Sequence, residues 1–250
     1  MKKKKIIFIV IGILLALFIA LVTYFVIEDF KEEKKLREDI IQINDMINSE
    51  KKDFKVIKKR LKTYMTTDDN LKLEKAVKEY YLDSVNLIEE FDKIYDEEKL
   101  SSIITISNFV VDGKDFTISK NYLSGVKNSL DNYSKKVEEQ LSNEKKKTYC
   151  TKYSLDSYYK DLFNELTDNF SYFGTESSFR NEIEEIKTFI DKIDNVITFL
   201  IDNKDYWNIV NYNIEFKSNE KLKEFGVLVN EVVSSSDSNN SNSNDGDEKL

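Results

Sequence analysis

An uncharged, strongly apolar run near the N-terminus constrains the fold more than any other feature. It covers residues 6–27, which are 22 residues without a charged side chain, Asn, Gln or Pro. As an α-helix rising about 1.5 Å per residue, the run is about 33 Å long, enough to cross a hydrocarbon core of about 30 Å. Residues 2–5 are all lysine, and basic flanks stay on the cytoplasmic side of a membrane. We predict a single-pass anchor at residues 6–27, with residues 1–5 in the cytoplasm and residues 28–250 outside.

The same run could instead be a signal peptide that is removed after export. Signal peptides have an apolar region of about 7–15 residues followed by a small-residue cleavage site. This run is longer and ends in the bulky residues 21–27. A lipoprotein would need a cysteine just after the run, and the only cysteine is Cys150. We therefore expect an uncleaved signal anchor.

The composition of the remaining chain favours helices. The sequence contains no proline and only six glycines, whereas average proline usage near 5% would give about 12 in a chain of this length. Long elements with few tight turns are the expected result. Charged residues make up 34% of the chain, which suits helices that are apolar on one face and solvated on the other.

Charge and cysteine content limit the partners and the means of stabilisation. The formal net charge is −8, and because the four N-terminal lysines contribute +4, the part outside the membrane carries about −12. We therefore expect no nucleic-acid partner. One cysteine cannot form an intramolecular disulfide, so stability must come from helix packing. Abundant Lys, Asn and Ile with no His suggest an AT-rich bacterial genome, so we expect a bacterial cell membrane.

Apolar residues at helical spacing predict a series of helices. The anchor should continue directly into a first helix that ends near Met65, followed by a polar stop at residues 66–70. The apolar stripe of this helix, which Glu50 alone interrupts, is Leu36, Ile40, Ile43, Ile47, Phe54, Ile57, Leu61 and Tyr64. The strongest signal is the strict 4 and 3 alternation between Phe179 and Leu200. The other helices are predicted at residues 71–98, from Ser119 to 141 with a lysine-rich end at 144–147, at residues 155–166, and from Ser218 to 232.

Two segments do not show the apolar spacing of a helix. Residues 206–216 alternate apolar and polar side chains around Asn211 and Asn213, which predicts a small β-hairpin. Residues 100–118 lack a period. They fit either two short strands joined at Asp112 and Gly113, or a short helix that ends with Gly113 as its left-handed cap.

Together these elements predict an all-α protein. An N-terminal transmembrane helix should lead into an elongated antiparallel bundle of about five or six helices at residues 28–233, with coiled-coil-like packing and one small hairpin. Residues 234–250 are Ser, Asn, Asp and Gly with almost nothing apolar, so we expect a disordered acidic tail.

Most common catalytic arrangements are absent from the sequence. With no histidine, Ser-His-Asp and Cys-His catalysis and histidine-ligated metals are ruled out. No glycine-rich phosphate loop or calcium loop occurs, and we expect no metal and no cofactor. Cys150 is interpreted as a packing residue. Acidic residues gather near the end of the predicted second helix, where we interpret them as a solvated face: Glu89, Glu90, Asp92, Asp96, Glu97 and Glu98.

One aromatic cluster is a candidate binding face. Amphipathic rings are enriched at interfaces, although helical spacing also fits a role in the core. We selected Tyr153, Tyr158 and Tyr172 as candidate binding residues. The full cluster is Tyr149, Tyr153, Tyr158, Tyr159, Phe163, Phe170, Tyr172 and Phe173.

These features predict a non-enzymatic interaction or scaffold module that binds a protein or cell-wall partner outside the membrane. A first alternative is an accessory subunit of a signalling or transport complex. With five residues inside, its signal would have to pass through a partner's transmembrane helix. A second alternative, from another class, is a cell-wall glycan hydrolase that uses paired carboxylates.

Overall fold

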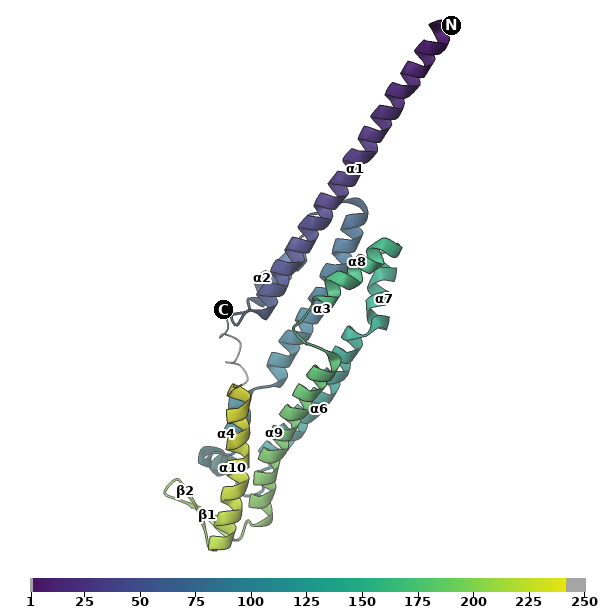
Figure 1. The fold of residues 1–250 in the computed structure, drawn as a ribbon. Helices are drawn as coiled ribbons and strands as arrows, with labels where there is room; N and C mark the ends of the chain where they lie inside the picture. Colours follow the sequence, from purple (N-terminus) through teal and green to yellow (C-terminus); the bar gives the residue numbers. More distant parts are fainter. Residues whose placement is uncertain (1, 242–250) are drawn as a thin grey trace. The chain divides into compact units, whose positions relative to one another are not determined.

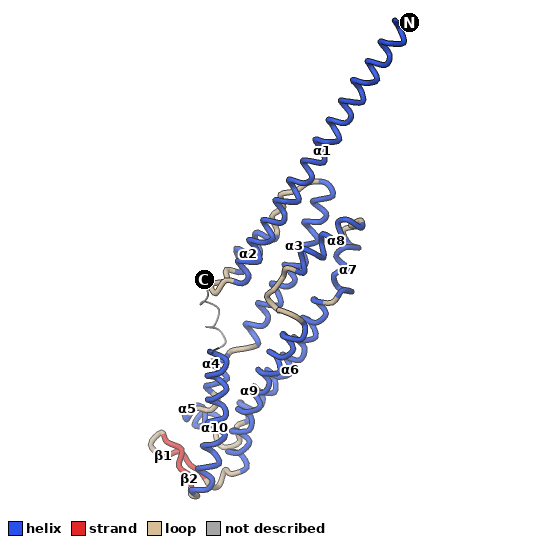
Figure 2. The backbone as a smooth tube through the Cα atoms, viewed as in Figure 1, coloured by secondary structure: helices blue, strands red, loops and turns tan. Residues whose placement is uncertain are grey.

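The computed structural model describes residues 2–241 of the 250-residue chain. The protein is mostly helical, with one two-stranded antiparallel sheet among the described residues (Figure 1, Figure 2). The chain divides into two compact units. Unit 1 contains Met1–Asn86 and Glu139–Gly174, and unit 2 contains Leu87–Glu138 and Thr175–Leu250.

Unit 1 is built around the long N-terminal helix. Its complete helices are α1 (Lys2–Asn48), α2 (Phe54–Leu61), α7 (Asn143–Lys152) and α8 (Ser157–Asp168), and it includes most of α3 (Asp68–Ile94). Within the described residues, α1 is the one helix long and apolar enough to cross a membrane, a property that membrane anchors share with signal sequences.

The α1 stripe after the apolar run forms the centre of unit 1, as predicted. Leu36, Ile40, Ile43 and Ile47 are all buried. Each such side chain stabilises the fold by about 1.5–3 kcal/mol relative to an exposed position. The stripe is buried because α2, α3 and α8 supply contacts to the same part of α1, as the ion pair of Arg60 with Asp39 and that of Arg37 with Glu165 show.

The prediction of one helix from the anchor to Met65 was wrong. The first helix ends at Asn48, and Asp53 then caps α2 by accepting a hydrogen bond from Val56 N. Glu50 would have placed a charge in the apolar stripe of a continuous helix. The chain avoids that cost by turning at residues 49–53, and the Arg60 side chain of α2 pairs with Asp39 of α1.

Two other helix boundaries differ from the predictions. The second helix ends at Ile94 rather than 98, because Asp96 caps α4 (Glu97–Ser102) by accepting from Lys99 N. The third, α6 (Thr117–Leu141), ends before the lysine-rich segment at 144–147. Ser142 begins α7 by accepting a hydrogen bond from Lys145 N. Short polar caps decide these boundaries, and they carry no periodic signal.

In unit 2, residues 100–118 form short helices, one of the two structures that the sequence allowed. They form α4 and α5 (Ile106–Asp112), and the strand alternative was wrong. Gly113 ends α5 with φ of 70° and donates its N–H to Phe109 O at 3.1 Å. Glycine adopts this left-handed conformation without the steric cost that other residues bear.

The predicted hairpin is confirmed. Strands β1 (Trp207–Val210) and β2 (Asn213–Phe216) pair antiparallel, with Trp207 opposite Phe216. Asn211 and Tyr212 have φ of 49° and 58°, which matches the two-residue turn that the twist of a hairpin favours. Trp207 is buried and donates its indole N–H to Leu200 O at 2.7 Å.

The helix with the strictest spacing is also confirmed. It is α9 (Glu176–Asp202), which Thr175 begins through a capping box with Ser178. The stripe residues are all buried: Phe179, Ile183, Ile186, Ile190, Ile193, Ile197 and Leu200.

The last helix is longer than predicted. α10 (Asn219–Ser241) continues past residue 234, where we expected a disordered tail to begin. Residues 242–250, the rest of that predicted tail, lie outside the described residues.

Candidate functional site

The structure divides the aromatic cluster of residues 149–173 into core and surface. Tyr149, Phe163, Phe170 and Phe173 are buried. The first three pack edge-on against Tyr80 of α3, with ring centroids 5.7–6.2 Å apart. Edge-to-face packing of this kind adds about 0.5–1.5 kcal/mol per pair beyond area burial. This half of the cluster belongs to the core of unit 1.

The three candidate residues lie at separate contacts. Tyr153 is half-buried and donates its hydroxyl to Glu79 of α3 at 2.6 Å. Tyr158 is 54% exposed and donates to Glu33 of α1 at 2.6 Å. Tyr172 is half-buried, with the Lys52 ammonium 5.3 Å from its ring centroid. The structure therefore does not gather them into one compact platform.

The electrostatic settings of Tyr153 and Tyr158 also differ. Burial raises the pKa of Tyr153, and the Glu79 carboxylate that accepts its proton raises it further. The hydrogen bond to Glu33 is the main reason for the raised pKa of Tyr158. Both phenols stay protonated at neutral pH and act as hydrogen-bond donors.

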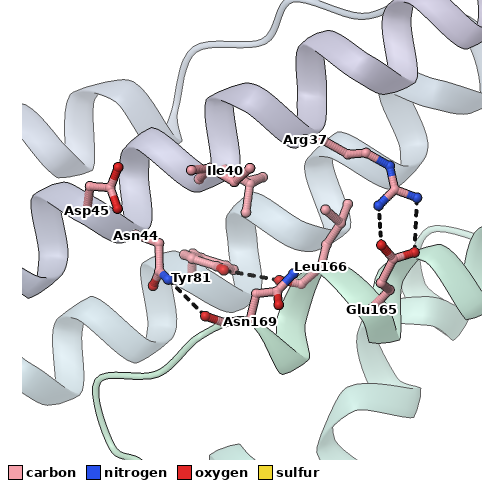
Figure 3. Close-up of a pocket in the computed structure, with 9 residues that line it drawn as sticks. Arg37, Ile40, Asn44, Asp45, Tyr81, Glu165, Leu166 and Asn169 are labelled. Carbon is pink, nitrogen blue, oxygen red and sulfur yellow. Dashed lines mark hydrogen bonds and ion pairs between the residues drawn. The ribbon is translucent and has the colours of Figure 1, made fainter. Parts of the chain in front are cut away.

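A groove between α1 and α8 has both apolar and polar walls (Figure 3). It encloses about 380 Å³. The buried side chains of Ile40, Tyr81 and Leu166 line it, and Ile41, which is 57% exposed, stands at its edge. Tyr81 donates its hydroxyl to Leu166 O at 3.1 Å, which fixes α8 against α3.

One end of the groove is closed by an ion pair. The guanidinium of Arg37 makes two parallel contacts with the Glu165 carboxylate, one of them Nη2 to Oε2 at 2.9 Å, and its Nε donates to Glu33 at 3.0 Å. The hydrogen bond from Arg37 lowers the pKa of Glu165, so the pair stays charged at neutral pH. Bidentate pairs of this kind fix geometry as well as charge.

The other end of the groove holds an unused hydrogen-bond acceptor. Asn44 donates its amide N–H to Asn169 O at 2.8 Å, while its Oδ1 is buried and accepts no hydrogen bond from any described residue. A buried acceptor without a partner costs about 1–3 kcal/mol. Asp45 lies beside it with an exposed carboxylate. The groove can therefore hold an apolar group that ends in an N–H donor.

A smaller hollow lies nearer the apolar end of α1. It encloses about 240 Å³, and Asp29, Phe30 and Glu33 of α1 form one wall. Tyr158 and Tyr159 of α8 form the opposite wall, with Asn70 of α3 between them. This hollow has more aromatic rings in its lining than the groove, namely Phe30, Tyr158 and Tyr159.

Among the other residues considered from the sequence, Cys150 and part of the acidic segment are buried or paired within the fold. Cys150 is buried, and burial raises the pKa of its thiol, which lowers its reactivity. In the acidic segment, Glu90 pairs with Lys136 at 2.6 Å, and Asp96 caps α4. No group of three or more metal-ligating side chains was found among the described residues.

Sequence reasoning missed Arg37, Asn44 and Glu165. Arginine is rare in this lysine-rich chain, with Arg37, Arg60 and Arg180 as its three examples. Each one makes an ion pair to a carboxylate on another helix. The scarcity of arginine was therefore a usable signal, since its planar fork suits fixed pairing with carboxylates better than lysine does.

No protein-family model, curated protein or solved structure matches this chain.

Proposed function

We propose that this protein is a single-pass membrane protein whose helical part lies outside the cell membrane of a bacterium and binds a protein or a cell-envelope component. One observation carries the proposal. The same helix, α1, contains the apolar run of residues 6–27, the buried stripe of unit 1 and one wall of the groove. A binding surface is thereby fixed directly to the anchor, with no linker between them.

The lysines at residues 2–5 support the proposed orientation, because basic flanks stay in the cytoplasm. The 4 and 3 spacing of α9 supports the inference that the helices outside the membrane pack as an antiparallel, coiled-coil-like bundle. The groove supports binding, because it combines an exposed apolar edge at Ile41 with an unused acceptor at Asn44.

Cysteine labelling in intact cells tests the orientation. The native Cys150 is buried and gives a low background. The exposed Ser124 of α6, replaced as Ser124→Cys, should react with a membrane-impermeant maleimide in intact cells. The matched variant Lys3→Cys should react only after permeabilisation. The opposite pattern would contradict the proposed orientation.

Site-specific photo-crosslinking in intact cells tests the binding function. A diazirine amino acid replaces Ile41 at the groove edge or, as a matched control, Ile118 of α6, which is 64% exposed in unit 2. We expect a discrete adduct from position 41 and none from position 118. Equal adducts at both positions, or none at either, would count against the groove as the binding surface.

A further inference from the structure

The hollow at the apolar end of α1 has the lining of a cation site. Tyr158 and Tyr159 meet edge to face with ring centroids 5.3 Å apart, and Phe30 stands opposite them. Aromatic faces attract ammonium groups through the ring quadrupole, by about 0.5–2 kcal/mol depending on desolvation. Carboxylates of Asp29 and Glu33 line the same hollow. Both the rings and the acids favour a positive ligand.

The two lining carboxylates are not equivalent. Glu33 already accepts hydrogen bonds from Tyr158 at 2.6 Å and from Arg37 at 3.0 Å. Asp29 makes no hydrogen bond or ion pair within the described part of the chain. Burial, followed by the carboxylates of Asp29, Asp69 and Asp156, raises the pKa of Tyr159 to about 12, a second sign of the local negative potential. Asp29 is the charge left for a ligand.

A buried amide gives an independent sign of a ligand. Asn70 is 3% exposed, lines the hollow, and its side chain makes no hydrogen bond to any described residue. A ligand that brings N–H donors would satisfy its oxygen. A quaternary ammonium, which has no N–H group, would leave that oxygen unpaired.

The hollow also has a defined level relative to the anchor. Its α1 wall runs from Val26, inside the apolar run, to Glu33. At about 1.5 Å per residue, Asp29 stands about 3 Å and Glu33 about 9 Å beyond Ile27. The headgroup layer outside the hydrocarbon core is about 5–7 Å thick. Asp29 therefore lies within the layer of the lipid headgroups, and Glu33 lies just beyond it.

We infer that this hollow binds the primary ammonium headgroup of a membrane phospholipid, with Asp29 and Asn70 as its hydrogen-bond acceptors and the rings of Tyr158 and Tyr159 around it. This inference rests on the anchoring part of the proposed function. Binding at this site holds unit 1 against the outer headgroup layer and depends on the type of lipid headgroup. The groove between α1 and α8 remains free for a different partner.

Binding of short-chain lipids to the full chain in a non-ionic detergent tests the site. The probes are dihexanoyl phosphatidylethanolamine, which carries a primary ammonium, and dihexanoyl phosphatidylcholine, which carries a quaternary one. We expect at least tenfold tighter binding of the ethanolamine lipid, because only it can donate to Asp29 and Asn70. Asp29→Asn should weaken that binding about tenfold. The control is Glu38→Gln, an exposed acid on the same helix that lines neither hollow, which should leave it unchanged.

A second variant guards against a folding defect. Asn70→Leu should reduce the preference for the ethanolamine lipid over the choline lipid, a ratio that a uniform loss of folded protein does not alter. Equal binding of the two lipids to the wild-type chain, or equal losses in the Asp29 and Glu38 variants, would overturn the inference. Tighter binding of N-acetyl-lysine amide than of the lipid would overturn the lipid assignment, because the ammonium would then come from a protein.

These outcomes are separable from those of the labelling and crosslinking experiments. Binding in detergent depends on the hollow alone and not on membrane orientation or on a partner at Ile41. A chain with the reversed orientation would still show the Asp29 effect if the hollow binds ammonium lipids.

Discussion

Replacing Lys78 by methionine should destabilise unit 1 more than almost any other single change to a charged residue. The Lys78 side chain is 1% exposed and lies at the centre of a buried charge network (relative exposure of Glu74 0%, of Asp39 2%). Its ammonium lies 2.7 Å from Glu74 Oε1 and donates to Thr63 O at 2.6 Å. It also lies 2.6 Å from Asp39 Oδ2, as an ion pair that is not aligned as a hydrogen bond.

The size of the effect follows from what the substitution leaves behind. Methionine fills a similar volume but has no charge, so Glu74 loses its cation while it remains fully buried. Asp39 keeps a second partner, because Arg60 Nε lies 2.7 Å from its Oδ1. Removing one partner of a buried pair costs about 3–5 kcal/mol, a large part of the 5–15 kcal/mol that stabilises an ordinary domain. Opening of unit 1 should become more frequent by about two to three and a half powers of ten.

Hydrogen exchange with mass spectrometry can measure this change separately in the two units. We expect Lys78→Met to lower protection in the part of α1 that follows the apolar run and in α3, and to leave α9 of unit 2 nearly unchanged. The matched control is Lys72→Met on the same helix, where an exposed lysine pairs with Asp69 and little change is expected. Adding Glu74→Gln to Lys78→Met should recover part of the lost protection, because it removes the buried charge that has lost its cation. Unchanged protection in the single variant would refute the assigned role of the network.

Three further predictions follow from the same structure. Ile190→Asp places a charge at a fully buried position of α9 and should cost several kcal/mol, measured as the loss of a cooperative unfolding transition. Tyr149→Ala should lower the free energy of unfolding by about 3–5 kcal/mol, because Tyr149 is buried. Tyr158→Ala should lower it by about 1 kcal/mol or less, because Tyr158 is 54% exposed. Equal losses in denaturant titrations would count against this difference. Burial opposes ionisation of Glu74, but hydrogen bonds from Lys78, Thr66 and Met65 lower its pKa below the ordinary 4.5. The contribution of Glu74 to the stability of the fold is therefore complete at neutral pH and should decline as the pH falls below about 4.5. A stability that rises on acidification would contradict that sign.

Periodicity predicted the parts of the fold in which burial alone decides the structure. The stripe through Ile190 in α9 and the stripe from Leu36 to Ile47 in α1 are both buried as predicted. A helix with one apolar face must bury that face, so its spacing in the sequence is sufficient evidence. The hairpin was also predictable, since a two-residue turn at Asn211 between alternating strands has a recognisable pattern.

The parts that were not predicted depend on local or long-range polar contacts. The turn after Asn48 is set by the Asp53 cap and by Arg60, which reaches back to Asp39. Helices as short as α4 and α5 are too brief to show a period. Lys78 and Asp39 resemble ordinary surface charges in the sequence. Only the fold brings them together, so neither their burial nor their pairing has a signature in the chain.

The binding face proposed from the sequence stays a prediction, and it named a segment of the chain without its geometry. The segment from Tyr149 to Phe173 does contribute to both hollows, through Tyr158, Tyr159, Glu165 and Asn169. The opposite wall of each hollow comes from α1, more than a hundred positions earlier in the chain. A sequence pattern shows which residues share a face of one helix, but it does not show which helix that face meets.

Different faces of α1 meet the core and the two candidate sites. Residues 26, 29, 30 and 33 face the smaller hollow, residues 37, 41 and 44 face the groove, and residues 36, 40, 43 and 47 face the core. Neighbouring residues on a helix point about 100° apart, so a rotation of α1 by one position would expose core residues and remove Asp29 and Asn44 from their hollows together. The packed core therefore fixes the rotation of α1, and with it the direction in which this helix presents both candidate sites.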